Sequence, residues 1–293
     1  MGREMSHLLF WNGGVKKEKK RDKNWEKRIH TDLVWLEIEP FLRPGLKVLD
    51  AGGGFGRYSI PLAERGCQVT HFDLSPRMVK EAAKIARERG ISSIEFEIGK
   101  VQDLSRFPDY AFDLVISLDA PISYAYPEEK KALRELGRVT KDKLIVSVVN
   151  RWGQIPVAVE EELRFRNNLE ISRRFFREGN WDHPSFWENL EKKVPLLYRF
   201  VFPPLHAFTP SEIIDDLIEE GFRPLRVVAS GTLARLLPRR TLKKIVNSPS
   251  LYKEFLELSR EYDALFEVLG VGAKVASGLL VVGERKNNNE EMV

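Results

Sequence analysis

Short apolar runs alternate with longer amphipathic stretches over most of this 293-residue chain. Runs rich in β-branched and aromatic residues predict strands at residues 47–51, 68–73, 94–98, 112–118 and 143–149. Apolar residues at helical spacing predict helices from Trp25 to Leu42 and near residues 57–65, 76–89 and 127–140. Strands separated by helices of this length imply right-handed crossovers and a mostly parallel sheet, which is an α/β fold.

The C-terminal half continues this pattern and adds two long segments to it. Apolar runs predict strands at 222–229 and 278–283, and Thr209-Pro210-Ser211-Glu212 predicts a helix start with a capping box. Residues 151–207 and 231–275 are longer than ordinary connections, so we expect them to form a helical lid over the carboxyl ends of the strands.

The chain is therefore expected to have five parts. These are a mobile basic N-terminal arm (1–24), a nucleotide-binding core (25–150), an aromatic-rich lid (151–207), the C-terminal part of the core with its helical insertion (208–285) and a frayed tail (286–293). The aromatic residues of the lid are Trp152, Phe165, Phe175, Phe176, Trp181, Phe186, Trp187, Tyr198, Phe200 and Phe202. Most of them are expected to form the lid's own core, and one or two to line a pocket.

A glycine cluster follows the first strand and carries the strongest chemical signal. Asp50 stands just before Gly52-Gly53-Gly54, where a carboxylate would oppose a pyrophosphate and suit a ligand with positive charge. The dinucleotide pattern G-x-G-x-x-G also fails, because its third glycine position is Arg57. Asp73 ends the second strand about 20 residues on, where an acid can accept ribose hydroxyls. S-adenosylmethionine fits this combination, whereas an ordinary tight turn and a nicotinamide site fit it less well.

These residues resemble the motifs of class I S-adenosylmethionine-dependent methyltransferases. The resemblance rests on Val48-Leu49-Asp50-Ala51-Gly52-Gly53-Gly54-Phe55-Gly56, on Phe72-Asp73-Leu74-Ser75 with Met78, and on the segments 99–104 and 112–117. It implies a Rossmann-like, seven-stranded sheet whose last strand is antiparallel. Lys100 departs from the family, because many relatives have an acid there that accepts a hydrogen bond from adenine, which a lysine cannot do.

The same resemblance implies a set of cofactor-binding residues. Asp50, Gly52, Gly53 and Gly54 would hold the methionine portion, Asp73 the ribose, Leu74 and Met78 the neighbouring wall, and Val101 and Gln102 the adenine. A weaker likeness, to bacterial tRNA 5-carboxymethoxyuridine methyltransferases, rests on the triple glycine, on Ala63-Glu64-Arg65-Gly66 and on Gln102-Asp103.

Residues at the strand ends are the candidates for catalysis and for binding the acceptor. Asp119 can meet the methionine amine or act as a base, or can form an Asx turn before Pro121. Tyr124 can wall the methyl site or pack under the lid.

Other candidates lie farther along the chain. Asn150 and Arg151 follow the fifth strand, where Arg151 can grip an anionic acceptor or lie exposed. His206 is a candidate substrate contact or base, with a structural role as the alternative. Arg28 or His30 in the N-terminal helix can meet the cofactor carboxylate.

Composition narrows the class of protein. Hydrophobic residues make up 43% of the chain, but no stretch approaches the roughly 20 apolar residues that cross a bilayer. At the N-terminus an apolar stretch precedes a basic run, which is the reverse of the order in a secretory signal. A cytoplasmic protein is therefore expected. The single cysteine, Cys67, excludes a Cys-based zinc cluster, and no metal site is expected. Charged residues at 31% with little glutamine resemble thermostable proteins.

Positive charge is concentrated in two runs of the sequence. The net charge is +4, and the runs lie at residues 16–28 and 235–244. Such runs can bind RNA phosphates, although solvated lysines are the simpler reading. We therefore expect a methyltransferase that modifies an O or N atom of a small molecule. The alternatives are a methyltransferase acting on tRNA or another RNA, a non-catalytic cofactor-binding or scaffold protein, and a nicotinamide oxidoreductase.

Overall fold

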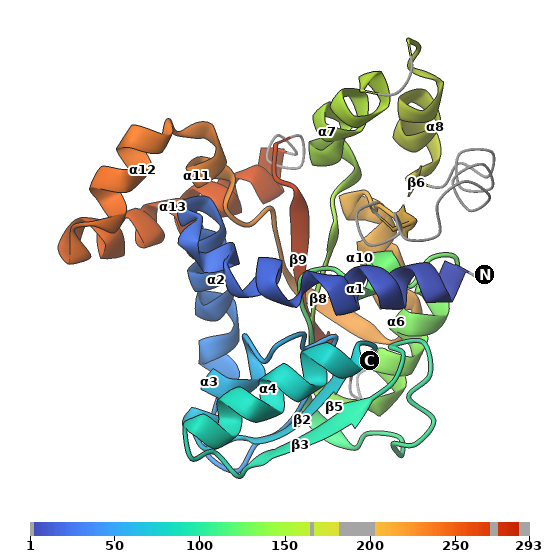
Figure 1. Cartoon of the computed structure of the whole chain (residues 1–293), viewed down its shortest axis with the longest axis vertical. Helices are drawn as coiled ribbons and strands as arrows, with labels where there is room; N and C mark the ends of the chain where they lie inside the picture. Colours follow the sequence, from blue (N-terminus) through green and yellow to red (C-terminus); the bar gives the residue numbers. More distant parts are fainter. Residues whose placement is uncertain (1–2, 165–166, 182–202, 270–274, 287–293) are drawn as a thin grey trace, which may run out of the picture.

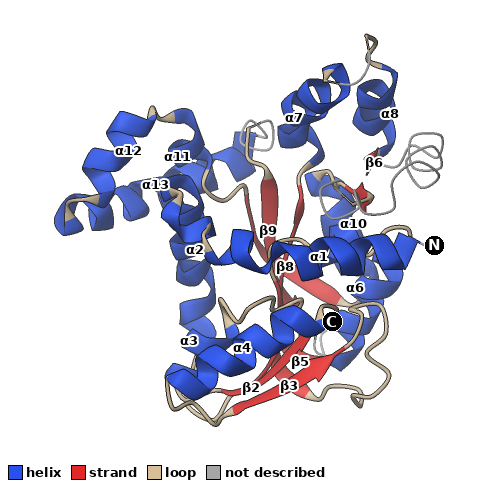
Figure 2. Ribbon diagram, in the orientation of Figure 1, coloured by secondary structure: helices blue, strands red, loops and turns tan. Residues whose placement is uncertain are grey.

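A seven-stranded sheet lies at the centre of the computed structural model, which describes residues 3–164, 167–181, 203–269 and 275–286 (Figures 1 and 2). Its strands are β1 (Lys47–Ala51), β2 (Gln68–Asp73), β3 (Ile94–Ile98), β4 (Phe112–Ser117), β5 (Thr140–Val149), β8 (Phe222–Val228) and β9 (Gly278–Arg285). The strand order is β3-β2-β1-β4-β5-β9-β8. β9 pairs antiparallel with both β5 and β8, while β1 to β5 pair in parallel. The expected Rossmann-like sheet with an antiparallel last strand is confirmed.

Helices cover both faces of the sheet, because successive strand residues point to opposite sides. Leu49 of β1 joins one buried cluster with α5 (Pro121–Tyr124), α6 (Glu129–Val139) and α10 (Pro210–Glu219). Val48 joins the other cluster with α2 (Trp25–Ile38), α3 (Ser59–Glu64) and α4 (Pro76–Glu88). Two apolar layers therefore hold the strands so that their carboxyl ends meet at one edge.

Element boundaries differ from the expected ones by a few residues. The first core helix, expected from Trp25 to Leu42, ends at Ile38 and is followed by the 3₁₀ turn Glu39–Phe41, because Pro40 cannot continue an α-helix. β5 begins at Thr140, three residues before the expected strand. The capping box is present: the Thr209 side chain accepts from the Glu212 backbone N–H, and Glu212 accepts from the backbone N–H of Thr209.

The N-terminal residues form a helix where a mobile arm is expected. Helix α1 (Arg3–Lys19) lies beside α4, drawn in blue across Figure 1, and the 3₁₀ turn Arg21–Lys23 links it to α2. Asn12 of α1 accepts a hydrogen bond of 2.6 Å from the Ser75 hydroxyl, and Lys19 pairs with Glu81 at 2.5 Å. Gly13 and Gly14 weaken the helical pattern of the segment, so its helical state depends on this packing rather than on local propensity.

The two expected insertions occupy different places. The first contributes α7 (Arg151–Leu163), α8 (Glu170–Glu178), β6 (Asn180–Trp181) and β7 (Leu205–His206), with α7 and α8 at the top of Figure 1. The second contributes α11 (Thr232–Leu236), α12 (Arg239–Val246) and α13 (Pro249–Leu269), which pack against α2 at the left of the view. In its described residues the second insertion is thus a side layer on α2 that lines the cavity near its start. None of the described helices combines the length and the apolar character needed to cross a bilayer.

The aromatic residues of the first insertion are only partly within the described residues. Phe175 is buried and meets Trp181 edge to face, with ring centroids 5.7 Å apart. Trp152 packs on Phe176, whose side chain is half exposed. Outside the described residues lie Phe165, Phe186, Trp187, Tyr198, Phe200 and Phe202. The described aromatics therefore pack with one another, as expected for a lid core.

Candidate active site

A large cavity lies at the carboxyl ends of the parallel strands. It has a volume of about 1040 Å³ and is lined by the loops after β1, β2, β3 and β4, by the start of β9, and by α1, α2, α7 and the segment around α11. A site for one small ligand has a volume of about 300–1,000 Å³, so this cavity has room for a cofactor and an acceptor. Ligands of open α/β sheets bind at this edge.

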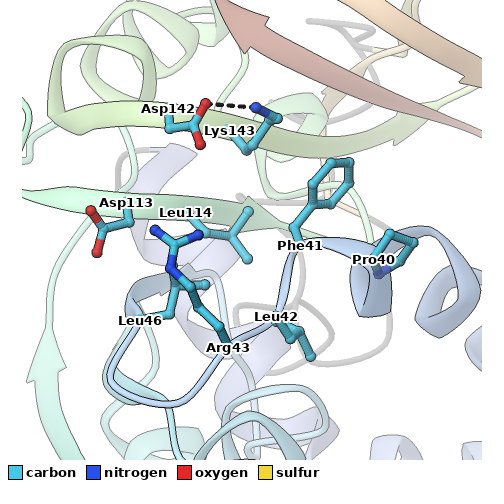
Figure 3. Close-up of a pocket in the computed structure, with 9 residues that line it drawn as sticks. All are labelled: Pro40, Phe41, Leu42, Arg43, Leu46, Asp113, Leu114, Asp142 and Lys143. Carbon is cyan, nitrogen blue, oxygen red and sulfur yellow. Dashed lines mark hydrogen bonds and ion pairs between the residues drawn. The ribbon is translucent and has the colours of Figure 1, made fainter.

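A smaller hollow lies at the opposite end of the sheet (Figure 3). It has a volume of about 330 Å³ and is lined by Arg43 and by residues at the amino-terminal ends of β1, β4 and β5. Its one lysine, Lys143, already pairs with Asp142 at 2.6 Å and with Glu284 at 2.8 Å. The carboxyl edge is therefore the candidate active site.

Glycine is required at the turn after β1 for steric reasons. The Gly52 backbone has φ +85°, and a Cβ there would lie 2.3 Å from Cγ of Pro121. A Cβ on Gly53 would lie 2.5 Å from Nδ1 of His71. The backbone N–H groups of Gly52 and Gly53 both donate to the Phe72 carbonyl, at 2.7 and 3.1 Å. The loop is thereby held against β2, with the backbone of all three glycines lining the cavity.

Asp50 lies behind this loop and does not line the cavity, contrary to the contact expected for it. Its side chain is 1% exposed and accepts a hydrogen bond of 2.5 Å from the Ser59 hydroxyl. The Ser59 oxygen also lies 2.8 Å from Nδ1 of His71. Burial raises the pKa of Asp50 to about 7 and lowers the pKa of His71 to about 4, so the histidine is neutral at pH 7. The physical reason is strand alternation: Asp50 points to the same face as Val48, toward α3.

Asp73 lines the cavity at the end of β2, as the sequence suggests. One carboxylate oxygen accepts from the Gly54 N–H at 2.9 Å and the other from the Ser75 N–H at 2.8 Å. Burial raises the pKa of Asp73 to about 6, although these two N–H groups act in the opposite direction. An ionised carboxylate has about four lone-pair sites, so two remain for the vicinal hydroxyls of a ribose.

The wall next to Asp73 is suited to an adenine ring. Leu74, Met78, Val101 and Gln102 line this part of the cavity, as expected, and Lys100 lines it too. Met78 is 2% exposed and supplies an apolar surface. Lys100, the residue at which the chain departs from the family, therefore lies in the cavity wall.

A cluster of charged residues surrounds Asp119 at the end of β4. Both Asp119 oxygens contact Arg21, each at 2.6 Å, while Arg57 lies at 3.7 Å and His30 at 3.9 Å. Burial acts to raise the pKa of Asp119, but Arg21, His30 and Arg57 outweigh it and the pKa is lowered. Asp119 is therefore held as a carboxylate.

This cluster fits the amino-acid end of S-adenosylmethionine. Next to it, the Tyr58 hydroxyl and Nε of Arg21 are buried and have no hydrogen-bond partner among the described residues. Both residues line the cavity, so they suit a ligand that carries a carboxylate, while Asp119 suits an ammonium group. Of the two residues expected to bind the cofactor carboxylate, His30 lines the cavity. Arg28 does not, because it lies 3.9 Å from Asp32 and over the ring of Tyr252.

Comparison with known proteins agrees with this geometry. Residues 48–143 match the family described as a methyltransferase domain. Magnesium protoporphyrin IX methyltransferase from Synechocystis, solved with bound S-adenosylmethionine, has the same fold, with a TM-score of 0.53, 17% identity and 98% of each chain covered. Residues 48–143 therefore resemble a methyltransferase domain, and the chain has the fold of the Synechocystis enzyme.

Sequence relatives match part of this chain. Magnesium-protoporphyrin O-methyltransferase of Synechocystis is 34% identical over 122 residues, which are 42% of this chain and 52% of that protein. tRNA 5-carboxymethoxyuridine methyltransferase of Escherichia coli K12 is 40% identical over 89 residues, which are 29% of this chain and 34% of that protein. The chain spans about half the length of the curated relatives it matches first.

Of the acceptor candidates around the methyltransferase domain, only those on the β4 loop reach the cavity. Tyr124 lines it and meets Trp11 of α1 edge to face, with ring centroids 5.2 Å apart. Burial raises the pKa of Tyr124, so its phenol is neutral at pH 7. Trp11 was not foreseen, because nothing in its local pattern points to a site 113 positions away.

The candidates after β5 hold the first insertion in place and do not line the cavity. Arg151 forms two contacts with the Glu212 carboxylate, at 2.5 and 2.6 Å, and donates to the Ala207 carbonyl. Asn150 donates to the Ala276 carbonyl at 2.7 Å. His206 Nδ1 lies 2.7 Å from the Asn180 side-chain oxygen, and burial lowers the pKa of His206. These contacts differ from the expected substrate binding, since each side chain is used within the fold.

Sequence reasoning missed Arg21, Arg57 and Tyr58. Arg57 stands where the dinucleotide pattern has its third glycine, and that departure was a usable signal. Arg21 lies within a basic run in which no feature distinguishes it from its neighbours. It reaches Asp119, 98 positions away, only because the turn after α1 passes over the end of β4.

Proposed function

We propose that the protein is an S-adenosylmethionine-dependent methyltransferase that transfers a methyl group to an O or N atom of a small molecule. One observation carries the proposal. A single cavity has a hydroxyl-binding carboxylate, Asp73, on one wall and a zwitterion-binding cluster, Arg21 with Asp119, on another. Ribose and methionine are the two parts of the cofactor that need these groups.

The chain's own task in such a reaction is alignment. Methyl transfer from a sulfonium is an in-line displacement that requires a fixed geometry and exclusion of water. Asp73 orients the ribose, and Arg21 with Asp119 orients the amino-acid end. Trp11 and Tyr124 supply an apolar wall that excludes water.

The state of Asp119 argues against its acting as a general base. Protonating it would sacrifice its contacts with Arg21, and its lowered pKa makes it a weak base at pH 7. The proposed role of Asp119 is therefore orientation of the cofactor. Tyr124 bounds the methyl site in its neutral form.

A small-molecule acceptor is favoured over RNA by the position of α1. Asn12 ties this helix to Ser75 at the cavity, and Trp11 of the same helix packs on Tyr124. The E. coli tRNA methyltransferase and the exposed basic residues of α12 favour the RNA alternative. Those residues are Arg239, Arg240, Lys243 and Lys244. The tRNA relative matches over 89 residues, which are 29% of this chain, so its likeness gives the RNA alternative limited support.

Binding of S-adenosylhomocysteine, measured by calorimetry, tests the cofactor site. Asp73→Ala is expected to weaken binding at least about tenfold, because two charge-assisted hydrogen bonds are lost. Asp113→Ala is the matched control, since Asp113 lies at the opposite end of the sheet (Figure 3). Failure of the unaltered protein to bind this ligand would overturn the proposal.

Turnover with methyl-labelled S-adenosylmethionine separates the alternatives. The protein is incubated with RNA and small-molecule fractions of an extract from its source cells. Label in the small-molecule fraction supports the proposed acceptor class. Label in RNA favours the alternative, and binding without label in any fraction favours a non-catalytic protein.

A further inference from the structure

The cavity continues past the cofactor-binding residues to a wall formed by α2 and the start of the second insertion. Lys27 and His30 of α2 line this wall, together with Ser230, Gly231 and Arg235. The His30 side chain is hydrogen-bonded to the Ser230 backbone, and a Cβ on Gly231 would lie 3.6 Å from Cβ of His30. The two segments are therefore in contact and form one surface.

Two cations on this wall form no ion pair. Neither Lys27 nor Arg235 lies within ion-pair distance of an acid among the described residues, although both line the cavity. The pKa of Lys27 is lowered, first by burial and then by the charge of Arg21; Arg235 acts in the same direction, and together they outweigh the more distant carboxylates of Glu26 and Asp119. Arg21 and Arg57, in contrast, share Asp119 and Glu18 as partners.

A buried hydroxyl lies in the same wall of the cavity. The Ser230 side chain is 7% exposed, and its Oγ has no hydrogen-bond partner among the described residues. The next residue holds it in place, because the Gly231 N–H donates to buried Asp263 at 3.0 Å. A buried hydroxyl without a partner is unfavourable, so its presence in a cavity wall points to a ligand that satisfies it.

The cofactor cannot supply the missing negative charge. S-adenosylmethionine carries a sulfonium, an ammonium and a carboxylate, and therefore adds net positive charge to the cavity. Its carboxylate is also accounted for by Arg21 and Tyr58. The remaining cations on the α2–α11 wall need a second, anionic ligand.

We infer that the methyl acceptor is a small molecule with an oxyanion group, such as a carboxylate, which Lys27, Arg235 and the Ser230 hydroxyl bind. This inference rests on the proposed function, because it assigns the anion to the acceptor of that reaction. The ammonium and guanidinium groups neutralise the oxyanion, and the hydroxyl donates to it. The subsite selects the acceptor and has no part in holding the cofactor.

A pair of fluorescent probes tests this subsite with and without S-adenosylhomocysteine. Anilinonaphthalene sulfonate carries an oxyanion on an apolar body, and phenylnaphthylamine is the same body without the charge. We expect the sulfonate to bind the unaltered protein more tightly than the uncharged probe. Lys27→Met, Arg235→Met and Ser230→Ala should each weaken sulfonate binding, about tenfold for the two cations, and leave the uncharged probe unaffected.

Two exposed residues of α12 provide matched controls. Arg240→Met and Lys244→Met remove the same charges outside the cavity and should leave sulfonate binding unchanged. Equal binding of the two probes, or equal effects in cavity and control variants, would overturn the inference. Calorimetry of S-adenosylhomocysteine keeps the two proposals apart. If the unaltered protein does not bind S-adenosylhomocysteine, the proposed function is overturned. The probe result alone decides the anion subsite.

Discussion

Replacement of Asp50 by Asn should stabilise the protein at alkaline pH. The Asp50 carboxylate is fully buried behind the glycine loop, where ionisation is unfavourable. Asn has nearly the same shape and no charge. Because the Ser59 hydroxyl can accept from an amide as well as donate to a carboxylate, the contact with Ser59 is preserved.

The magnitude follows from the shift in pKa. Burial raises the pKa of Asp50 from 3.8 to about 7, so the folded state holds this proton more tightly than the unfolded state. The free energy of unfolding of the unaltered protein therefore falls as pH rises from 3.8 to 7. A shift of about 3 units corresponds to about 4 kcal/mol in total, of which roughly 3 kcal/mol falls between pH 5 and pH 8.

Urea unfolding of both proteins at pH 5 and pH 8 measures this effect. The stability difference, Asp50→Asn minus unaltered, should be about 3 kcal/mol larger at pH 8, since all other titrating groups cancel. Asp113→Asn is the control: burial raises the pKa of Asp113, but the Lys47 N–H and Lys141 outweigh it and lower that pKa below the ordinary value, so the stability difference for this variant should not change between pH 5 and pH 8. A difference for Asp50→Asn that does not change with pH would refute the reasoning.

Three further changes test other parts of the site. Affinity for S-adenosylhomocysteine, measured by calorimetry, should fall about tenfold from pH 7 to pH 5, because the ribose hydroxyls need ionised Asp73, whose pKa is about 6. An affinity that does not change between these pH values would contradict this role of Asp73. Gly52→Ala should destabilise the protein by about 1–3 kcal/mol in urea and weaken cofactor binding, since the new Cβ would meet Pro121 at 2.3 Å. Arg151→Met should cost about 1–2 kcal/mol, because the half-exposed Glu212 carboxylate and the Ala207 carbonyl lose a donor, yet should leave cofactor affinity unchanged; reduced affinity would return Arg151 to the site.

Local patterns predicted the sheet and placed the glycines and Asp73 at the candidate site. The glycines after β1 and Asp73 after β2 lie within a few residues of the strands that place them, so strand prediction also located them at one edge. Asp50 shows where this reasoning ends. Its sequence position next to the glycines suggested a ligand contact, but the alternation of side chains along β1 directs it to the α3 face. Asp50 therefore supports the loop through Ser59.

The rest of the site depends on contacts between distant segments. Arg21 meets Asp119, Trp11 meets Tyr124, and His30 contacts Ser230, and none of these pairs has a spacing that periodicity can detect. Conversely, Arg151 and His206 have suitable chemistry at strand ends, but packing of the first insertion occupies their polar groups.

Binding of the cofactor and binding of the acceptor therefore depend on different parts of the chain. The cofactor-binding loops are short and bound to strand ends, where a change of one side chain disturbs the fold. The acceptor wall uses Lys27 and Arg235, which lie on helices outside the sheet and form no ion pair with the described residues. A substitution there breaks no ion pair among the described residues. Acceptor selectivity can change at these two positions while the sheet, the glycine loop and the binding of S-adenosylmethionine stay intact.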